Sequence, residues 1–131
     1  PVFVTADELG DAWSGCKLHL PMRTWINGRW FGEAEAGVDM QFSFADLIAH
    51  VAKSRPLTAG TLVGSGTIAN EDTSKGASCL AEQRTVETLR DGKPATPFLK
   101  FGDRVKIDIT DQAGRSVFGA IEQVVKQYVP A

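Results

Sequence analysis

The stretch LHLPMRTWINGRWF, at residues 18–31, decides the class of fold. Side chains alternate along its first half with a period of two, which is typical of a half-buried strand. Asn27-Gly28 follows, and this pair favours a type I′ turn, in which both central residues adopt positive φ. We therefore predict a β-hairpin. Trp30 belongs to its outgoing strand, and the alternating residues of its incoming strand are Leu18, Leu20, Met22, Thr24 and Ile26.

One helix is expected after the hairpin. Ser43 is a suitable N-cap and Asp46 stands at the third helical position, which is the pattern of a capping box. Pro56 ends the helix, because the residue before a proline is disfavoured in the helical region. The apolar residues at helical spacing are Phe44, Leu47, Ile48 and Val51.

The rest of the chain is expected to form short strands. Thr5, with Glu8 three residues on, predicts a capped turn of helix over residues 6–9. The 131 residues suffice for one domain, and about seven strands with one helix predict a mainly β domain of the α+β class. The expected turns are Asp91-Gly92 and Ala113-Gly114, and the expected strands cover residues 2–4, 61–63, 79–89, 105–109 and 117–125.

Composition excludes several classes of function. The net charge of -2 leaves no basic excess to neutralise phosphates, so no nucleic-acid partner is expected. No apolar run approaches the roughly 18 residues of a membrane span, so no membrane partner is expected either. The two cysteines, Cys16 and Cys79, match no zinc pattern and are expected to be reduced thiols of a cytoplasmic protein.

The beginning of the chain is unusual. Residue 1 is Pro rather than Met, and the apolar run Val2-Phe3-Val4 follows at once. A strand that starts at the first residue leaves unpaired backbone groups unless it has neighbours on both sides. We therefore expect the chain to be a piece of something longer, with a segment missing before Pro1.

Several stretches, in order along nearly the whole chain, resemble the fumarylacetoacetate hydrolase family. The clearest is AGTLVGSGT at residues 59–67, which contains Gly66 and Thr67. Any one stretch is weak, and the ordered set is what carries the resemblance. The others are PVFVT at 1–5, the hairpin with Asn27-Gly28, FADLIAH at 44–50, SCLAEQR at 78–84, TPF at 96–98, FGD at 101–103 and FGAIE at 118–122.

The resemblance implies that residues 1–131 form the C-terminal part of a catalytic domain with a mixed β-roll or sandwich fold. It implies a homodimeric enzyme that hydrolyses carbon–carbon bonds of small diketo acids, of the fumarylacetoacetate or acylpyruvate type, in aromatic-compound catabolism. Some relatives instead decarboxylate, isomerise or hydrate similar acids. It also implies a Mg²⁺, Mn²⁺ or Ca²⁺ ion, held by carboxylates upstream of Pro1, so no metal ligand is expected in this chain. The alternative is a catalytically incomplete fragment or a non-catalytic β-domain serving in oligomerisation.

Gly66 and Thr67 are the candidate substrate-binding residues. Glycines let the backbone approach a ligand closely, and the threonine offers a hydroxyl and an amide to a carboxylate or oxo group. A strand-end turn with a solvated threonine is the alternative reading of the residues alone. The resemblance, which places the family's substrate-binding Gly-Thr pair here, favours the functional reading.

Glu82 is the candidate catalytic residue, because some family members use a glutamate on the strand after this loop, paired with a histidine from upstream, to activate water. Counting back from Asp91-Gly92 favours Glu87 instead, so the choice between the two stays open. An exposed strand glutamate near Arg84 or Arg90 is the alternative without function.

Other residues with metal-binding or stacking chemistry are interpreted as structural. Glu33 and Glu35 have the spacing of a carboxylate pair on one strand face, but they run into Gly37 and are predicted to lie in a solvated loop. His19 and His50 lack a neighbouring cluster of ligands. The tryptophans are expected in the core or in a subunit contact, and they are Trp13, Trp25 and Trp30.

Overall fold

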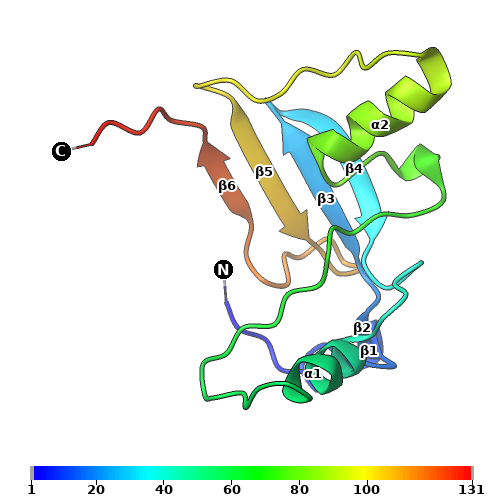
Figure 1. Ribbon diagram of the computed structural model, residues 1–131, viewed down its shortest axis with the longest axis vertical. Coiled ribbons are helices and arrows are strands. Elements are labelled where there is room, and N and C mark those ends of the chain that lie inside the picture. Colours follow the sequence, from blue (N-terminus) through cyan, green and yellow to red (C-terminus); the bar gives the residue numbers. More distant parts are fainter. Residues whose placement is uncertain (1, 131) are drawn as a thin grey trace.

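The computed structural model describes residues 2–130. Its centre is an antiparallel four-stranded sheet in the order β4-β3-β5-β6, with α2 lying across one end of it (Figure 1). Helix α1 and the small β1–β2 hairpin form a separate group at the other end. The elements are η1 (Gly10–Ala12), β1 (Trp13–Ser14), β2 (Lys17–Leu18), β3 (Pro21–Ile26), β4 (Arg29–Glu35), α1 (Phe44–Ala52), η2 (Thr73–Lys75), α2 (Leu80–Asp91), β5 (Arg104–Ile109) and β6 (Ile121–Val124).

The prediction of a mainly β domain with an added helical part is confirmed, and so is the hairpin. Asn27 and Gly28 adopt φ values of 51° and 74°, as a type I′ turn requires. The Asn27 side chain also ties the turn to the next strand: it donates to Asp103 at 2.9 Å and accepts from the Arg104 N–H at 2.9 Å. The turn therefore fixes both the β3–β4 register and its approach to β5.

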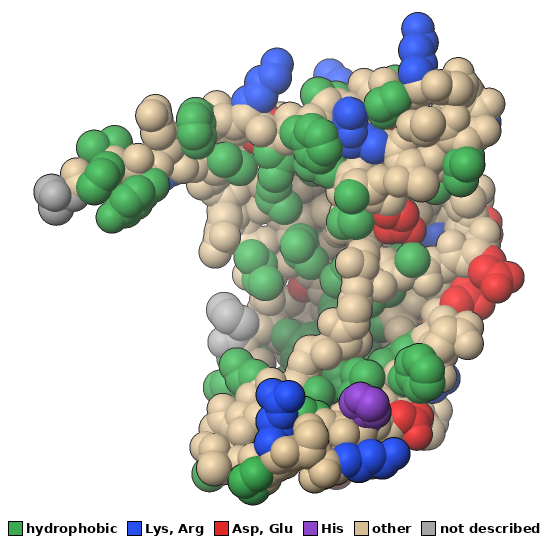
Figure 2. Space-filling view, viewed as in Figure 1, with side chains coloured by type: hydrophobic (Ala, Val, Ile, Leu, Met, Phe, Trp, Pro, Cys, Tyr) green, Lys and Arg blue, Asp and Glu red, His purple; other side chains and the backbone are tan. Residues whose placement is uncertain are grey.

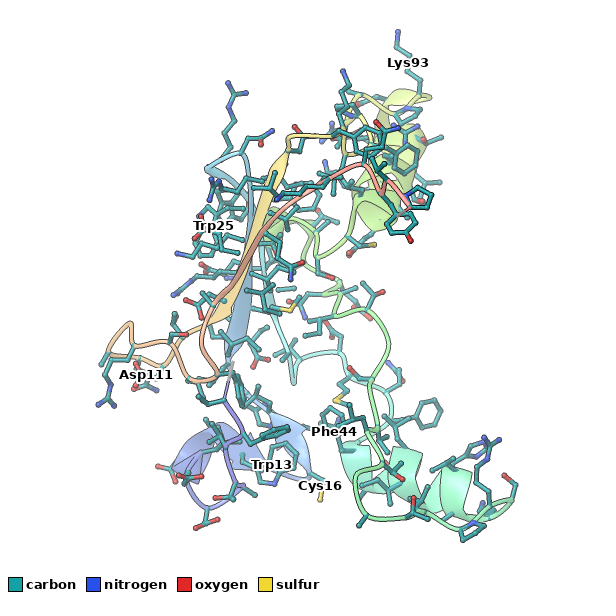
Figure 3. The ribbon with its side chains drawn as sticks, turned by 90° about the vertical axis from the view of Figure 1, so that its left-hand side faces the viewer. Trp13, Cys16, Trp25, Phe44, Lys93 and Asp111 are labelled. Carbon is teal, nitrogen blue, oxygen red and sulfur yellow. The ribbon has the colours of Figure 1, made fainter. Side chains whose placement is uncertain are left out.

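Helix α1 begins at its predicted capping box. The Ser43 side chain accepts from the Asp46 N–H, and the Asp46 carboxylate accepts from the Ser43 N–H at 2.9 Å. The ring of Phe44, at the start of the helix, stacks on Trp13 of β1 with 6.0 Å between centroids (Figure 3). This contact packs α1 against the β1–β2 hairpin.

The predicted strand over residues 79–89 is wrong, because this segment is helix α2. The Cys79 thiol at the N-cap accepts from the Glu82 N–H, and the Glu82 carboxylate accepts from the N–H of Ser78, the residue before the N-cap, at 3.1 Å. Gly92, read from sequence as part of a turn, is the left-handed residue that ends the helix, with φ 80°. The interior is rich in helix formers, which the strand interpretation overlooked.

The other predicted strands differ in outcome. Residues 105–109 lie within β5, while residues 2–4 and 61–63 form no strand, and the last strand is confined to β6. Near the N-terminus, the Glu8 carboxylate accepts from the Thr5 N–H and hydroxyl at 2.8 Å each, but turns followed by η1 replace the predicted turn of helix. Ladder pairing depends on partners far along the chain, which a local apolar run does not reveal.

The apolar interior is small. Met22, Ile26, Val105, Ile107 and Ile109 share one face of the sheet by register, and all five are only half-buried. Hydrophobic side chains surround a hollow between the sheet and the α1 group (Figure 2). Among the described residues, the buried apolar side chains are Leu18, Leu20, Ala34 and Ala77.

None of the helices within residues 2–130 combines the length and the apolar character needed to cross a membrane.

Candidate functional site

Gly66 and Thr67 line a cavity of about 300 Å³ between two loops. One wall is the loop that follows β4, the opposite wall is residues 65–69, and Leu47 of α1 contributes from below. The wall after β4 consists of Ala36, Val38, Asp39, Met40, Gln41 and Phe42. The predicted substrate-binding pair therefore borders a concave site made by three separate parts of the chain.

The loop that carries this pair has free space and free donors. A Cβ atom added at Gly64 or Gly66 would meet no atom within 4 Å, and neither residue has positive φ. Nothing in the packing of residues 2–130 therefore requires glycine at these positions, which leaves room for a ligand to approach the backbone. The Thr67 side chain is exposed, and its hydroxyl makes no hydrogen bond within the same residues.

Hydrogen bonds of Asn70, Glu71 and Ser78 fix the loop immediately after Thr67. The Asn70 side chain accepts from the Glu35 N–H at 2.7 Å, and the Glu71 N–H donates to the Asp39 carboxylate at 2.9 Å. The Ser78 hydroxyl donates to the Ile68 carbonyl. Sequence analysis did not identify these residues, because each contact joins segments separated along the chain.

Glu82 lies in the first turn of α2 and is half-buried. Its carboxylate accepts from the N–H of Ser78, the residue whose hydroxyl holds Ile68. Glu82 does not line the cavity of Gly66 and Thr67, so a single residue, Ser78, connects the two candidate sites.

Glu87 is buried, with 5% of its surface exposed, and its carboxylate is fully engaged. It accepts from the Thr96 N–H at 2.8 Å, the Thr96 hydroxyl at 2.5 Å, the Ala95 N–H at 2.6 Å and the Gln83 amide at 2.9 Å. These bonds, those from Thr96 first, lower the pKa of Glu87 to about 2. A carboxylate with so low a pKa is a weak base at neutral pH, which favours Glu82 over Glu87 as the candidate for catalysis.

Glu33 and Glu35 lie on strand β4, so the predicted solvated loop is wrong. The Glu33 carboxylate pairs with Arg23 of β3 at 2.8 Å. The Glu35 carboxylate accepts from the Gly37 and Val38 N–H groups at 3.1 and 2.6 Å, which closes the turn after the strand. Both carboxylates therefore have structural partners.

No three His, Cys, Asp or Glu side chains within residues 2–130 come together as a site for a metal ion. His19 and His50 are both exposed, and His19 contacts the Ser14 carbonyl at 3.3 Å. The part of the chain described here thus does not fit a divalent cation by itself.

A larger cavity, of about 880 Å³, lies between the β3–β4 turn and α2. Its lining includes Trp30, Phe31, Phe98 and Lys100. Trp30 is 52% exposed, so of its two predicted places, the core or a subunit contact, it does not occupy the core. None of the predicted site residues borders this cavity.

Residues 1–126 match the family described as Fumarylacetoacetate (FAA) hydrolase C-terminal. No curated protein matches the chain.

Proposed function

Because the chain belongs to the fumarylacetoacetate hydrolase family, through the C-terminal segment of that family, we propose that it serves a metal-dependent hydrolase of small diketo acids. The family membership points to an enzyme of the hydrolase or isomerase type. In the proposal, the bond cleaved is a carbon–carbon bond of a fumarylacetoacetate- or acylpyruvate-type acid, in aromatic-compound catabolism.

The observation that carries the proposal is the cavity bordered by Gly66 and Thr67. The loop in its wall offers the exposed hydroxyl of Thr67. It also offers open backbone, because a Cβ atom added at Gly66 would meet no atom within 4 Å. Hydroxyl and amide donors suit the carboxylate and oxo groups of a diketo acid. At about 300 Å³, the cavity lies at the lower end of the range for small-molecule sites.

In the proposed reaction, water adds to a ketone carbonyl and the neighbouring carbon leaves with the electron pair as an enolate, which then takes up a proton. Thr67 would hold the acid, with its hydroxyl and N–H donating to a substrate oxygen. Glu82 would accept the proton of the attacking water. Its connection through Ser78 to the carbonyl of Ile68 supports a place near the same loop.

We propose that membership of this family brings a Mg²⁺, Mn²⁺ or Ca²⁺ ion, held by carboxylates upstream of Pro1. The segment that carries those carboxylates is part of the proposal, as are a homodimer and a cytoplasmic location. The many exposed apolar side chains support a partner surface of some kind.

The same surface favours a second candidate, a non-catalytic β-domain that serves in oligomerisation. The two candidates differ in what Thr67 does, because only the enzyme uses its hydroxyl to bind substrate.

Thr67→Ala in the intact protein is expected to lower kcat/KM for an acylpyruvate in the presence of Mg²⁺ about tenfold or more, because a donor to a charged group is lost. The measurement is the decrease in absorbance of the enol.

Thr85→Ala is the matched control. Thr85 is exposed on α2, and its hydroxyl bonds only to the Ala81 carbonyl within the helix. The Thr85→Ala variant should therefore keep the wild-type kcat/KM. Equal activity of the two variants, or a large fall in melting temperature for Thr67→Ala alone, would contradict the assignment of Thr67 to substrate capture.

A further inference from the structure

Asn70 connects the two walls of the cavity at their base. Its side-chain oxygen accepts from the Glu35 N–H at 2.7 Å, and its amide nitrogen donates to the Glu35 carbonyl at 3.1 Å and to the Val38 carbonyl at 3.2 Å. We propose that Asn70 is a positioning residue that sets the place of Thr67 for substrate. This inference rests on the proposed function.

The geometry imitates a pair of β-strand residues. In an antiparallel hydrogen-bonded pair, the N–H of each residue donates to the C=O of the other, so each residue uses both groups with one partner. Glu35 is the last residue of β4, and there the Asn70 amide takes the place of a partner backbone. Only a side chain with both an acceptor and a donor can do this, which selects an amide over a carboxylate.

The anchor on the opposite wall has hydrogen bonds of its own. The Glu35 carboxylate holds the N–H groups of Gly37 and Val38, so the turn that Asn70 contacts is closed independently. A second connection between the walls runs from the Glu71 N–H to the Asp39 carboxylate at 2.9 Å. Asp39 adopts φ 59°, a left-handed conformation that an aspartate tolerates better than most residues.

The hydrogen bonds that hold this loop begin at Ile68, the residue after Thr67. Ile68 is held through its carbonyl by Ser78, and Asn70 and Glu71 are held to the opposite wall. Within residues 2–130, Gly66 and Thr67 make no hydrogen bond to that wall, and the Gly66 carbonyl accepts only from its neighbour Ser65. Asn70 does not line the cavity. It therefore acts on substrate only by fixing the backbone three residues after Thr67, and small displacements of a positioning group are costly to the reaction.

The test is Asn70→Asp, which keeps the acceptor for the Glu35 N–H and replaces both donors with an oxygen facing the carbonyls of Glu35 and Val38. We expect KM for an acylpyruvate to rise about tenfold with kcat changed less than threefold. Asn27→Asp is the matched control: the Asn27 side chain also joins a turn to a distant segment, through the Asp103 carboxylate and the Arg104 N–H, but at the opposite end of β3. It should alter melting temperature without altering KM.

A double-mutant cycle with Thr67→Ala separates positioning from general support. If Asn70 acts through Thr67, Asn70→Asp has little further effect on KM once Thr67 is Ala. Additive effects overturn the inference and leave the proposed function intact. If Thr67→Ala by itself leaves the kinetics unchanged, the proposed function itself is overturned.

Hydrogen exchange gives a readout that does not depend on activity. In Asn70→Asp, the amides of Glu35 and Glu71 are expected to exchange at least tenfold faster, while those of β5 keep the wild-type rate. Unchanged protection at Glu35 and Glu71, or faster exchange throughout the sheet, would show that Asn70 is not a local connection between the walls.

Discussion

Glu87 lies buried on α2, yet its surroundings favour the charged carboxylate. Burial alone would raise its pKa, but hydrogen bonds from Thr96, Gln83 and Ala95 outweigh it and lower the pKa from 4.5 to about 2. The carboxylate joins the helix to the segment after it, at Ala95 and Thr96. Its role is to hold that segment, which continues into the lining of the larger cavity.

This shift makes stability depend on pH in a definite direction. The unfolded chain binds the proton near the ordinary pKa of 4.5, so the contribution of Glu87 is complete above about pH 5 and is lost as pH falls towards 2. Glu87→Gln removes this contribution, because the amide is uncharged and its NH₂ group faces other hydrogen-bond donors. We expect its melting temperature to be several degrees lower at pH 7 and the difference from wild type to shrink at pH 3.

Thermal unfolding followed by circular dichroism from pH 3 to pH 7 measures this difference in melting temperature. Glu82→Gln serves as the control, since no comparable set of donors surrounds that carboxylate. A difference between Glu87→Gln and wild type that stays constant over this range would contradict the assigned pKa.

At the scale of elements, the predicted structure was correct where the signal was local. Asn27-Gly28 and the Ser43–Asp46 capping box each specify their element within a few residues. Residues 79–89 carry two conflicting signals, a short alternating pattern and a run of helix formers that ends at Gly92, and the second matches the structure. A glycine after a run of helix formers is a stop signal that could have corrected this prediction.

The candidate site divides in the same way. Gly66 and Thr67 were identified from a short pattern, whereas Asn70 gains its role only from contact with Glu35, 35 residues earlier. Figure 1 shows why: the segment between α1 and α2 runs back from the α1 group towards α2, which brings its residues beside the end of β4. No periodicity or composition in the sequence reports such a return.

Gly92→Ala tests the end of α2. Gly92 has φ 80° and no atom within 4 Å of an added Cβ, so the variant brings left-handed strain without a clash. We expect the free energy of unfolding to fall by about 1 kcal/mol. Urea denaturation measures it, and Gly64→Ala is the control, because Gly64 has the same open space without positive φ. Equal stability of the two variants would contradict a left-handed helix end.

At the scale of the molecule, the chain leaves much apolar surface uncovered. Its buried apolar side chains are few, and the described residues include no large side chain that is fully buried. The hollow bordered by hydrophobic side chains in Figure 2 continues this pattern. Patches of this kind mark contact surfaces in folded proteins. The proposed homodimer and the proposed upstream segment would each cover part of it.

Strand β6 is an outer strand of the sheet, and all four of its residues are exposed. An outer strand with apolar side chains is a site for association between chains. Ile121, 44% exposed, pairs with Ile107 on the apolar face. We expect Ile121→Lys to shift the protein towards the monomer in sedimentation velocity, because a charge at this edge opposes contact with another copy. Leu89→Lys, at an 83% exposed position on α2, is the control and should sediment like wild type. If Ile121→Lys associates as wild type does, β6 takes no part in the contact between copies.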